Sequence, residues 1–158
     1  MRLIPVIVIS LVLLGCGKHV KQISLLATTE INLDEEGNGA PVDVAMYFLS
    51  DTVAIAAATF SEIWNGDRQP ELGQVRPPTV LTFWPGGEPQ TVELPSDAKK
   101  QGIKFVGFAG RFREHEAACW KSWYPIADVK EKLQVTLTGS CIEVQNEAAH
   151  KQRPERTD

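Results

Sequence analysis

Short apolar runs separated by turn residues are the feature that most limits how this chain can fold. The runs cover residues 22–33, 42–49, 79–84, 90–95, 103–112 and 133–144, and clusters of glycine, proline or acidic residues separate most of them. Several runs alternate apolar and polar residues, which is the period of a β-strand with one buried side. Their number and spacing predict a mainly β protein, built as an antiparallel β-sandwich.

Three of these runs have a clear predicted inward face. Its members are Ile23, Leu25, Ala27, Thr29, Ile31 and Leu33 in the first run; Val42, Val44, Met46 and Phe48 in the second; and Leu133, Val135, Leu137 and Cys141 in the last. The apolar phase of the last run shifts after Ser140, which indicates a bulge or the end of burial. The segment 113–125 is polar and then aromatic, and we expect it to be a connection.

One segment follows the helical period instead. Ser50 and Asp51 offer an N-cap, and an alanine-rich stretch then leads to Asn65 and Gly66, which suit a helix end. Its apolar residues recur at helical spacing: Val53, Ala56, Ala57, Phe60, Ile63 and Trp64. The sequence thus predicts a helical insertion over about 52–65, after the second strand, with one stripe docked on the sandwich.

The first residues have the pattern of a secretory signal. Arg2 precedes an apolar run that is shorter than the roughly 20 residues of a spanning helix. Gly15 and Cys16 complete a string, Leu-Leu-Gly-Cys, that resembles a bacterial lipobox. We expect residues 1–15 to be removed and Cys16 to carry a diacylglycerol and an N-acyl chain; an ordinary signal with a coincidental cysteine is the alternative. Gly17, in place of an aspartate, favours the outer membrane and a domain that faces the periplasm.

The rest of the chain suits one domain. Residues 16–21 are predicted to be a lipidated tether, 22–145 the sandwich, and 146–158 a polar, disordered tail. The formal net charge of the full chain is −4, and no basic block or recognition motif occurs, so nucleic acid is not an expected partner.

Two cysteines remain once Cys16 is lipidated. In an oxidising compartment, a disulfide between Cys119 and Cys141 is the default expectation, and two free thiols are the alternative. A bridge over this separation would stabilise the fold by roughly 3 kcal/mol through loop closure.

The chain offers little for catalysis or for a metal. His115 and Cys119 lie four residues apart, but the second histidine of a zinc-binding helix is missing. The same pair lacks the third group that would orient a base-assisted thiolate. No phosphate-binding glycine loop occurs. We therefore expect no enzymatic activity, no metal, no non-covalent cofactor and no small-molecule substrate.

Two features could serve recognition. Trp84, Trp120, Trp123 and Tyr124 could form an aromatic platform for a glycan such as peptidoglycan, although aromatic residues at strand ends more often pack in a core or rim. The adjacent acids Asp34, Glu35 and Glu36, with Gly37 and Gly39, predict a projecting loop. Such a loop is either a solvated turn or a surface that docks on a basic partner.

Five features in order resemble one known family. They are the lipobox, the loop INLDEEGNGAPV, the strand VDVAMYFLSD with FSEIW after it, the turn WPGG, and IKFVGFAGRFRE followed by Trp120. Together these motifs resemble the type VI secretion lipoproteins TssJ, also called VasD, over nearly all of the mature chain. Asn32, Asp34, Gly39 and Pro41 agree with the family's loop pattern, whereas Leu33 replaces a proline.

The resemblance implies a fold, a partner and a location. The fold would be a transthyretin-like β-sandwich with an added helical element, held at the outer membrane by its lipid and facing the periplasm. The partner would be the periplasmic part of the inner-membrane protein TssM, bound without any catalysis. The contact would be the loop between the first and second strands, here Asn32, Leu33, Asp34, Glu35, Glu36, Gly37, Asn38 and Gly39.

Overall fold

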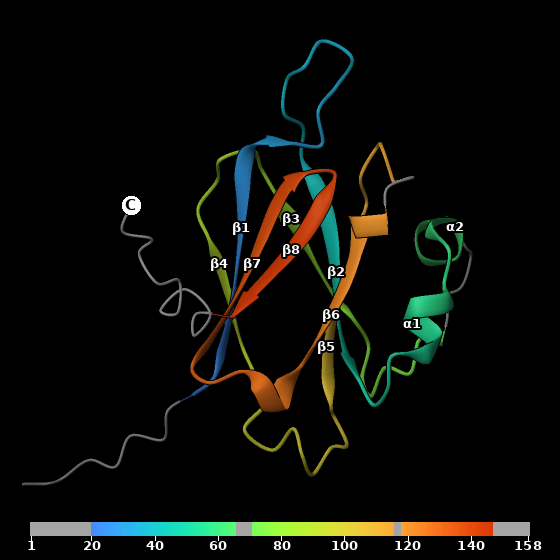
Figure 1. The fold of residues 1–158 in the computed structure, drawn as a ribbon, viewed down its shortest axis with the longest axis vertical. Coiled ribbons are helices and arrows are strands. Elements are labelled where there is room, and N and C mark those ends of the chain that lie inside the picture. The colour runs from blue at the N-terminus through green and yellow to red at the C-terminus, as the bar shows by residue number, and fades with distance from the viewer. Residues whose placement is uncertain (1–19, 66–70, 116–117, 147–158) are drawn as a thin grey trace, which may run out of the picture.

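Two four-stranded sheets packed face to face make up the protein (Figure 1). The computed structural model describes residues 20–65, 71–115 and 118–146. One sheet has the strand order β4-β1-β7-β8 and the other has the order β3-β2-β5-β6. The elements are β1 (Gln22–Ile31), β2 (Val42–Leu49), α1 (Val53–Ala57), α2 (Phe60–Trp64), β3 (Thr79–Phe83), β4 (Gln90–Glu93), β5 (Phe105–Gly110), the 3-10 turn η1 (Ala118–Trp120), β6 (Lys121–Pro125), the 3-10 turn η2 (Ile126–Asp128), β7 (Lys132–Gly139) and β8 (Cys141–Asn146). The predicted sandwich is confirmed.

One strand pair departs from the antiparallel pattern. β1 and β7 run parallel, with Ile23 opposite Leu133 and Leu25 opposite Val135, while the other named pairs are antiparallel. These two strands lie at opposite ends of the domain's sequence, so no short hairpin forces them to run in opposite directions.

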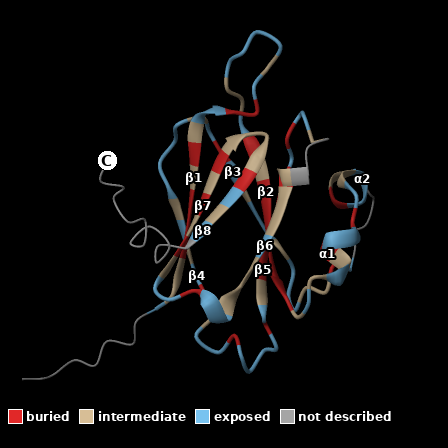
Figure 2. Cartoon of the chain, in the orientation of Figure 1, coloured by how far each residue is buried: buried red, intermediate tan, exposed pale blue. Residues whose placement is uncertain are grey.

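The core lies between the sheets, where Figure 2 shows most of the buried residues. The predicted inward residues of β7, Leu133, Val135 and Leu137, are fully buried, as are Ile23 and Leu25 of β1. The predicted inward face of the first run is wrong at Thr29 and Leu33, which are exposed. The reason is that pairing of β1 with β7 becomes irregular after Ala27 and β1 ends at Ile31.

The predicted last strand, 133–144, is two strands. A turn at Gly139 and Ser140 reverses the chain, and Thr138 pairs with Cys141 across it. Gly139 has a φ of 55°, the left-handed backbone that such tight turns require. The shift in apolar phase after Ser140 therefore marks a hairpin, and the prediction of a bulge or a loss of burial was wrong.

The predicted connection 113–125 also contains a strand. Residues Lys121–Pro125 form β6, which pairs with β5 and is the edge of its sheet. Its residues are intermediate or exposed rather than buried, so the sequence has no alternation of apolar residues there that would predict a strand.

The helical insertion consists of two short helices, not one. Ala58 is extended, with φ −61° and ψ 136°, and ends α1. Thr59 then caps α2 by a capping box: its hydroxyl accepts from the Glu62 N–H, and the Glu62 carboxylate accepts from the Thr59 N–H. The hydrogen bonds that the Glu62 carboxylate accepts from the Thr59 N–H and, secondarily, from the Thr59 hydroxyl hold the pKa of Glu62 below its ordinary value.

The break in the helix changes which side chains dock. Ile55, which the predicted stripe omits, is fully buried, and Val53, which it includes, is 76% exposed. Gly107 of β5 makes room, because a Cβ there would come within 2.8 Å of the Ile55 Cδ1 and the Leu49 Cδ1. The insertion thus covers part of the outer face of this sheet, over β2 and β5, and the residues of β2 are buried from Val44 to Leu49.

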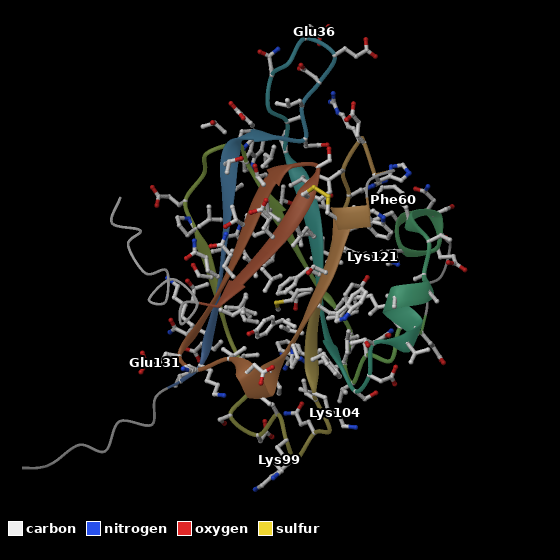
Figure 3. The ribbon with its side chains drawn as sticks, viewed as in Figure 1. Glu36, Phe60, Lys99, Lys104, Lys121 and Glu131 are labelled. Atoms are coloured by element: carbon white, nitrogen blue, oxygen red, sulfur yellow. A yellow bond between two sulfur atoms is a disulfide. The ribbon has the colours of Figure 1, made fainter. Side chains whose placement is uncertain are left out.

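Lys121 of β6 adds a polar contact to the insertion (Figure 3). Its Nζ donates hydrogen bonds to the carbonyl oxygens of Ile55 at 2.9 Å, Ala56 at 2.7 Å and Ala58 at 2.6 Å. These carbonyls belong to the last turn of α1, where a helix leaves acceptors unpaired and where a cation is favourable. Burial lowers the pKa of Lys121, and the Glu62 carboxylate offsets part of this effect.

Candidate functional site: an acidic loop at one end of the sandwich

The loop 32–41 connects β1 to β2 and extends beyond the end of both sheets, with Glu36 at its far end (Figures 1 and 3). Other connections lie at the same end, because strand direction brings them there: 84–89 after β3, 111–115 after β5, 118–120 before β6, and 139–140 between β7 and β8. The base of the loop, which we call the neck, is the paired stretch formed by residues 31–34 and 38–40. It is closed by the Ala40 N–H donating to the Ile31 carbonyl at 3.1 Å and the Asp34 N–H donating to the Asn38 carbonyl at 2.9 Å.

Asn32 fixes the neck to the rest of the domain. Its side chain is 5% exposed, its Nδ2 donates to the Pro41 carbonyl at 2.7 Å, and its Oδ1 accepts from the Arg113 N–H at 2.8 Å. Its backbone N–H donates to the Gly139 carbonyl at 2.8 Å. Asn32 also has a φ of 49°, a left-handed conformation that asparagine tolerates better than most residues. It therefore holds the loop in place and is not part of an exposed contact surface.

Asp34 shapes the tip. Its Oδ1 accepts hydrogen bonds from the N–H groups of Asn38 at 2.7 Å and Glu36 at 3.1 Å, and Gly37 donates to its carbonyl at 3.0 Å. The Asn38 N–H is the main reason that the pKa of Asp34 lies below its ordinary value, with smaller contributions from the Asn38 side chain, the Glu36 N–H and Arg113. Asp34 therefore stays ionised while it closes the turn.

The tip presents negative charge to solvent. Glu35, Glu36, Gly37 and Asn38 are all exposed. Because Asp34 folds the backbone, the carboxylates of Glu35 and Glu36 project from a defined turn. The arrangement can attract and orient a basic surface.

The turn 84–87 supports the neck from one side. The Gly86 N–H donates to the Thr28 carbonyl of β1 at 3.0 Å. A Cβ at Gly39 would lie 2.5 Å from the Thr29 carbonyl oxygen and 2.9 Å from the Pro85 Cβ, so only glycine fits between β1 and this turn. The Pro-Gly of this turn is recognisable in the sequence as a motif, but its position against the loop depends on the tertiary fold.

A disulfide joins Cys119 and Cys141 at the same end, with their Cα atoms 4.7 Å apart. Cys141 follows the 139–140 turn that accepts from Asn32, and Cys119 lies in η1, after the segment that carries Arg113. The bridge thus connects the two segments that hold Asn32. It also means that Cys119 offers no thiolate as a nucleophile or a metal ligand.

The predicted aromatic platform does not form. Trp120 is 7% exposed and belongs to the core, where its ring meets Phe60 edge-on. Trp84 follows β3 and Trp123 lies in β6, and these strands are the two opposite edges of one sheet. His115 stacks on Phe60 with ring centroids 3.7 Å apart. Among the residues that the structure describes, no three potential metal ligands gather.

A family model decides what the chain is related to. The model described as Type VI secretion lipoprotein (VasD, EvfM, TssJ) matches residues 20–140, most of the chain. The chain belongs to the type VI secretion lipoprotein family. A comparison with curated proteins finds no match.

Solved structures share the fold of this type VI secretion lipoprotein. A chain of a structure described as the T6SS protein TssM C-terminal domain from EAEC is 21% identical, with a TM-score of 0.68; the alignment covers 79% of this chain and 99% of that one. The T6SS lipoprotein TssJ1 from Pseudomonas aeruginosa is 21% identical, with a TM-score of 0.66 and coverage of 80% and 94%. A chain of a type VI membrane complex is also 21% identical, with a TM-score of 0.68 and coverage of 80% and 98%.

Three predicted features of this type VI secretion lipoprotein have no structural description. Cys16, the predicted lipid site, and the signal 1–15 lie outside the described residues, as does the predicted tail beyond Asn146. In the described part of the chain, no helix has the length and apolar character needed to cross a membrane.

Proposed function

We propose that this protein anchors the membrane complex of a type VI secretion system by binding the periplasmic domain of a TssM-type inner-membrane protein through the loop 32–39. Family membership supports the secretion system. Structural neighbours described as a TssM C-terminal domain and a type VI membrane complex support the partner. The observation that carries the proposal is the acidic loop itself, which is fixed at its neck and free at its tip.

The loop is suited to binding because it is already ordered. Asn32 and Asp34 together donate or accept eight hydrogen bonds that set the path of residues 32–41. A segment that has its bound shape beforehand loses less conformational entropy when a partner arrives. The acidic tip would raise the association rate with a basic partner, and this effect would fall as salt is added.

The anchor itself is proposed to be Cys16, acylated at the inner leaflet of the outer membrane. More than one acyl chain is needed for stable attachment, since each buried CH₂ contributes about 0.8 kcal/mol. The role requires no chemistry on a substrate, and the family is one of secretion-system lipoproteins.

Charge reversal at the tip tests the loop. We expect Glu35→Lys with Glu36→Lys to weaken binding to the purified periplasmic domain by about a hundredfold, because like charges would face each other. These two side chains are exposed, so the melting temperature of the double variant should equal that of wild type. The matched control is Glu93→Lys with Glu131→Lys, the same charge change beside Gln22 at the other end of β1. Equal affinities for the two double variants would remove the loop from the proposal.

Lipidation is tested separately in cells. Wild-type protein should incorporate labelled palmitate and sediment with outer membranes, and Cys16→Ser should do neither, because the acceptor sulfur is gone. Secretion should also stop, since the complex would lose its attachment. A Cys16→Ser strain that secretes normally would contradict the anchoring role.

A further inference from the structure

Trp84 is a large apolar side chain left in solvent beside the loop. It is 66% exposed, and Leu33, in the neck, is 42% exposed. Exposed tryptophan is uncommon in a monomer surface and is enriched among the residues that dominate protein–protein interfaces. Single exposed apolar residues are ordinary, so the argument depends on where these two lie.

Contacts place both residues at the neck. Leu33 lies between the two hydrogen-bonded positions that close the neck, Ile31 with Ala40 and Asp34 with Asn38. Gly39 lies in the opposite strand of the neck and packs against Pro85, the residue after Trp84. Leu33 is therefore part of the neck, and Trp84 directly precedes the residue that packs against it.

The backbone that carries Trp84 is held firmly. The Gly87 N–H donates to the Trp84 carbonyl at 3.0 Å, and Gly86 is hydrogen-bonded to Thr28 of β1. A side chain presented from a fixed turn loses little backbone entropy on binding. The next exposed aromatic of this sheet, Trp123 (37% exposed), lies at the opposite edge, in β6.

We propose that Trp84 and Leu33 form the apolar part of the partner-binding surface, next to the acidic tip. The partner would then present an apolar pocket bordered by lysine or arginine side chains. This arrangement is the usual one of an interface, in which a buried apolar centre gives affinity and a charged rim gives rate and specificity. The inference rests on the proposed function, because it concerns the same partner.

Binding kinetics test the inference with full-length lipid-free protein and the cognate periplasmic domain. We expect Trp84→Ala to weaken affinity by about ten- to a hundredfold through faster dissociation, and Leu33→Ala to do so by less. The salt dependence of the association rate should stay as in wild type, because no charge changes. Trp123→Ala is the matched control and should bind within about threefold of wild type.

Tryptophan fluorescence gives a second measurement that needs no Trp84 variant to fold well. The experiment uses the Trp123→Ala variant of this protein and a partner domain that contains no tryptophan. Burial of Trp84 on binding should shift the fluorescence emission to shorter wavelength. No shift, or equal affinities of Trp84→Ala and Trp123→Ala, would overturn the inference. If Trp84→Ala binds as wild type while Glu35→Lys with Glu36→Lys does not, the proposed function stands and this inference fails. If wild type does not bind, both fail.

Discussion

β2 carries a long connection at each end, and the two are held in different ways. At its start, the loop 32–41 buries one side chain, Asn32, and is fixed by hydrogen bonds. At its end, the helical insertion buries Ile55 and Ile63 and is fixed mainly by apolar contact, with Lys121 added. Apolar contact stabilises the fold. The hydrogen bonds of the neck contribute less to stability, because water competes for the same groups, but they fix the conformation of the loop. We infer that the insertion serves stability and the loop serves recognition.

The strongest test of this contrast is Ile55→Ala. Ile55 is fully buried against Leu49 and Gly107, so truncation should lower the free energy of unfolding by about 2–5 kcal/mol. The affinity of the folded protein for the partner should not change. Urea denaturation and binding at low temperature would measure the two. Val53→Ala, at a 76% exposed position in the same helix, is the control and should change stability by less than about 0.5 kcal/mol. Lost affinity in folded Ile55→Ala would break the contrast.

Asn32→Ala should affect both properties. It removes the donor to Pro41 and leaves the Arg113 N–H without its acceptor, at a left-handed position. We expect a loss of about 2 kcal/mol of stability and a larger relative loss of affinity than Ile55→Ala shows. Asn32→Gly separates the causes, because glycine tolerates the backbone conformation but supplies no amide. Recovery of affinity in Asn32→Gly would show that the backbone conformation, rather than the amide, holds the loop.

The smallest expected effect is that of Thr59→Ala in the insertion. This change removes the capping box with Glu62 and should cost about 1 kcal/mol, with no change in binding. Thr59→Ser keeps the hydroxyl and should restore most of the stability. The melting temperatures and partner affinities of Thr59→Ala and Thr59→Ser, each compared with wild type, test this expectation. An effect of Thr59→Ala on affinity would mean that the insertion takes part in recognition.

Much of the sandwich could be predicted because a strand that is buried on one side has an apolar residue at every second position, as β1 and β7 do over much of their length. β2 is buried on both faces, yet its apolar run was still recognisable as a strand. β6 was missed because its short edge position imposes no such pattern. The two helices were merged because helical spacing does not reveal the extended backbone of Ala58, although Thr59 and Glu62 form a recognisable capping box signature.

The candidate site could be predicted in part for a related reason. Adjacent acids and glycines indicate a projecting loop from local sequence alone. The partners of Asn32, however, are Arg113 and Gly139, which are distant in the chain and meet it only through the sheet order. The closeness of the 84–87 turn likewise depends on tertiary structure. Local pattern therefore found the charge of the site but not its support or its apolar neighbours.

The direction of β1 bears on the proposed attachment of the protein through its amino-terminal cysteine. The strand starts at Gln22, a few residues after the proposed acyl site, and delivers the chain to the loop at its other end (Figure 1). Ten extended residues span about 30 Å. If Cys16 carries the proposed acyl chains, β1 would act as a spacer arm that sets the acidic tip away from the lipid surface, where a partner held in the other membrane could reach it.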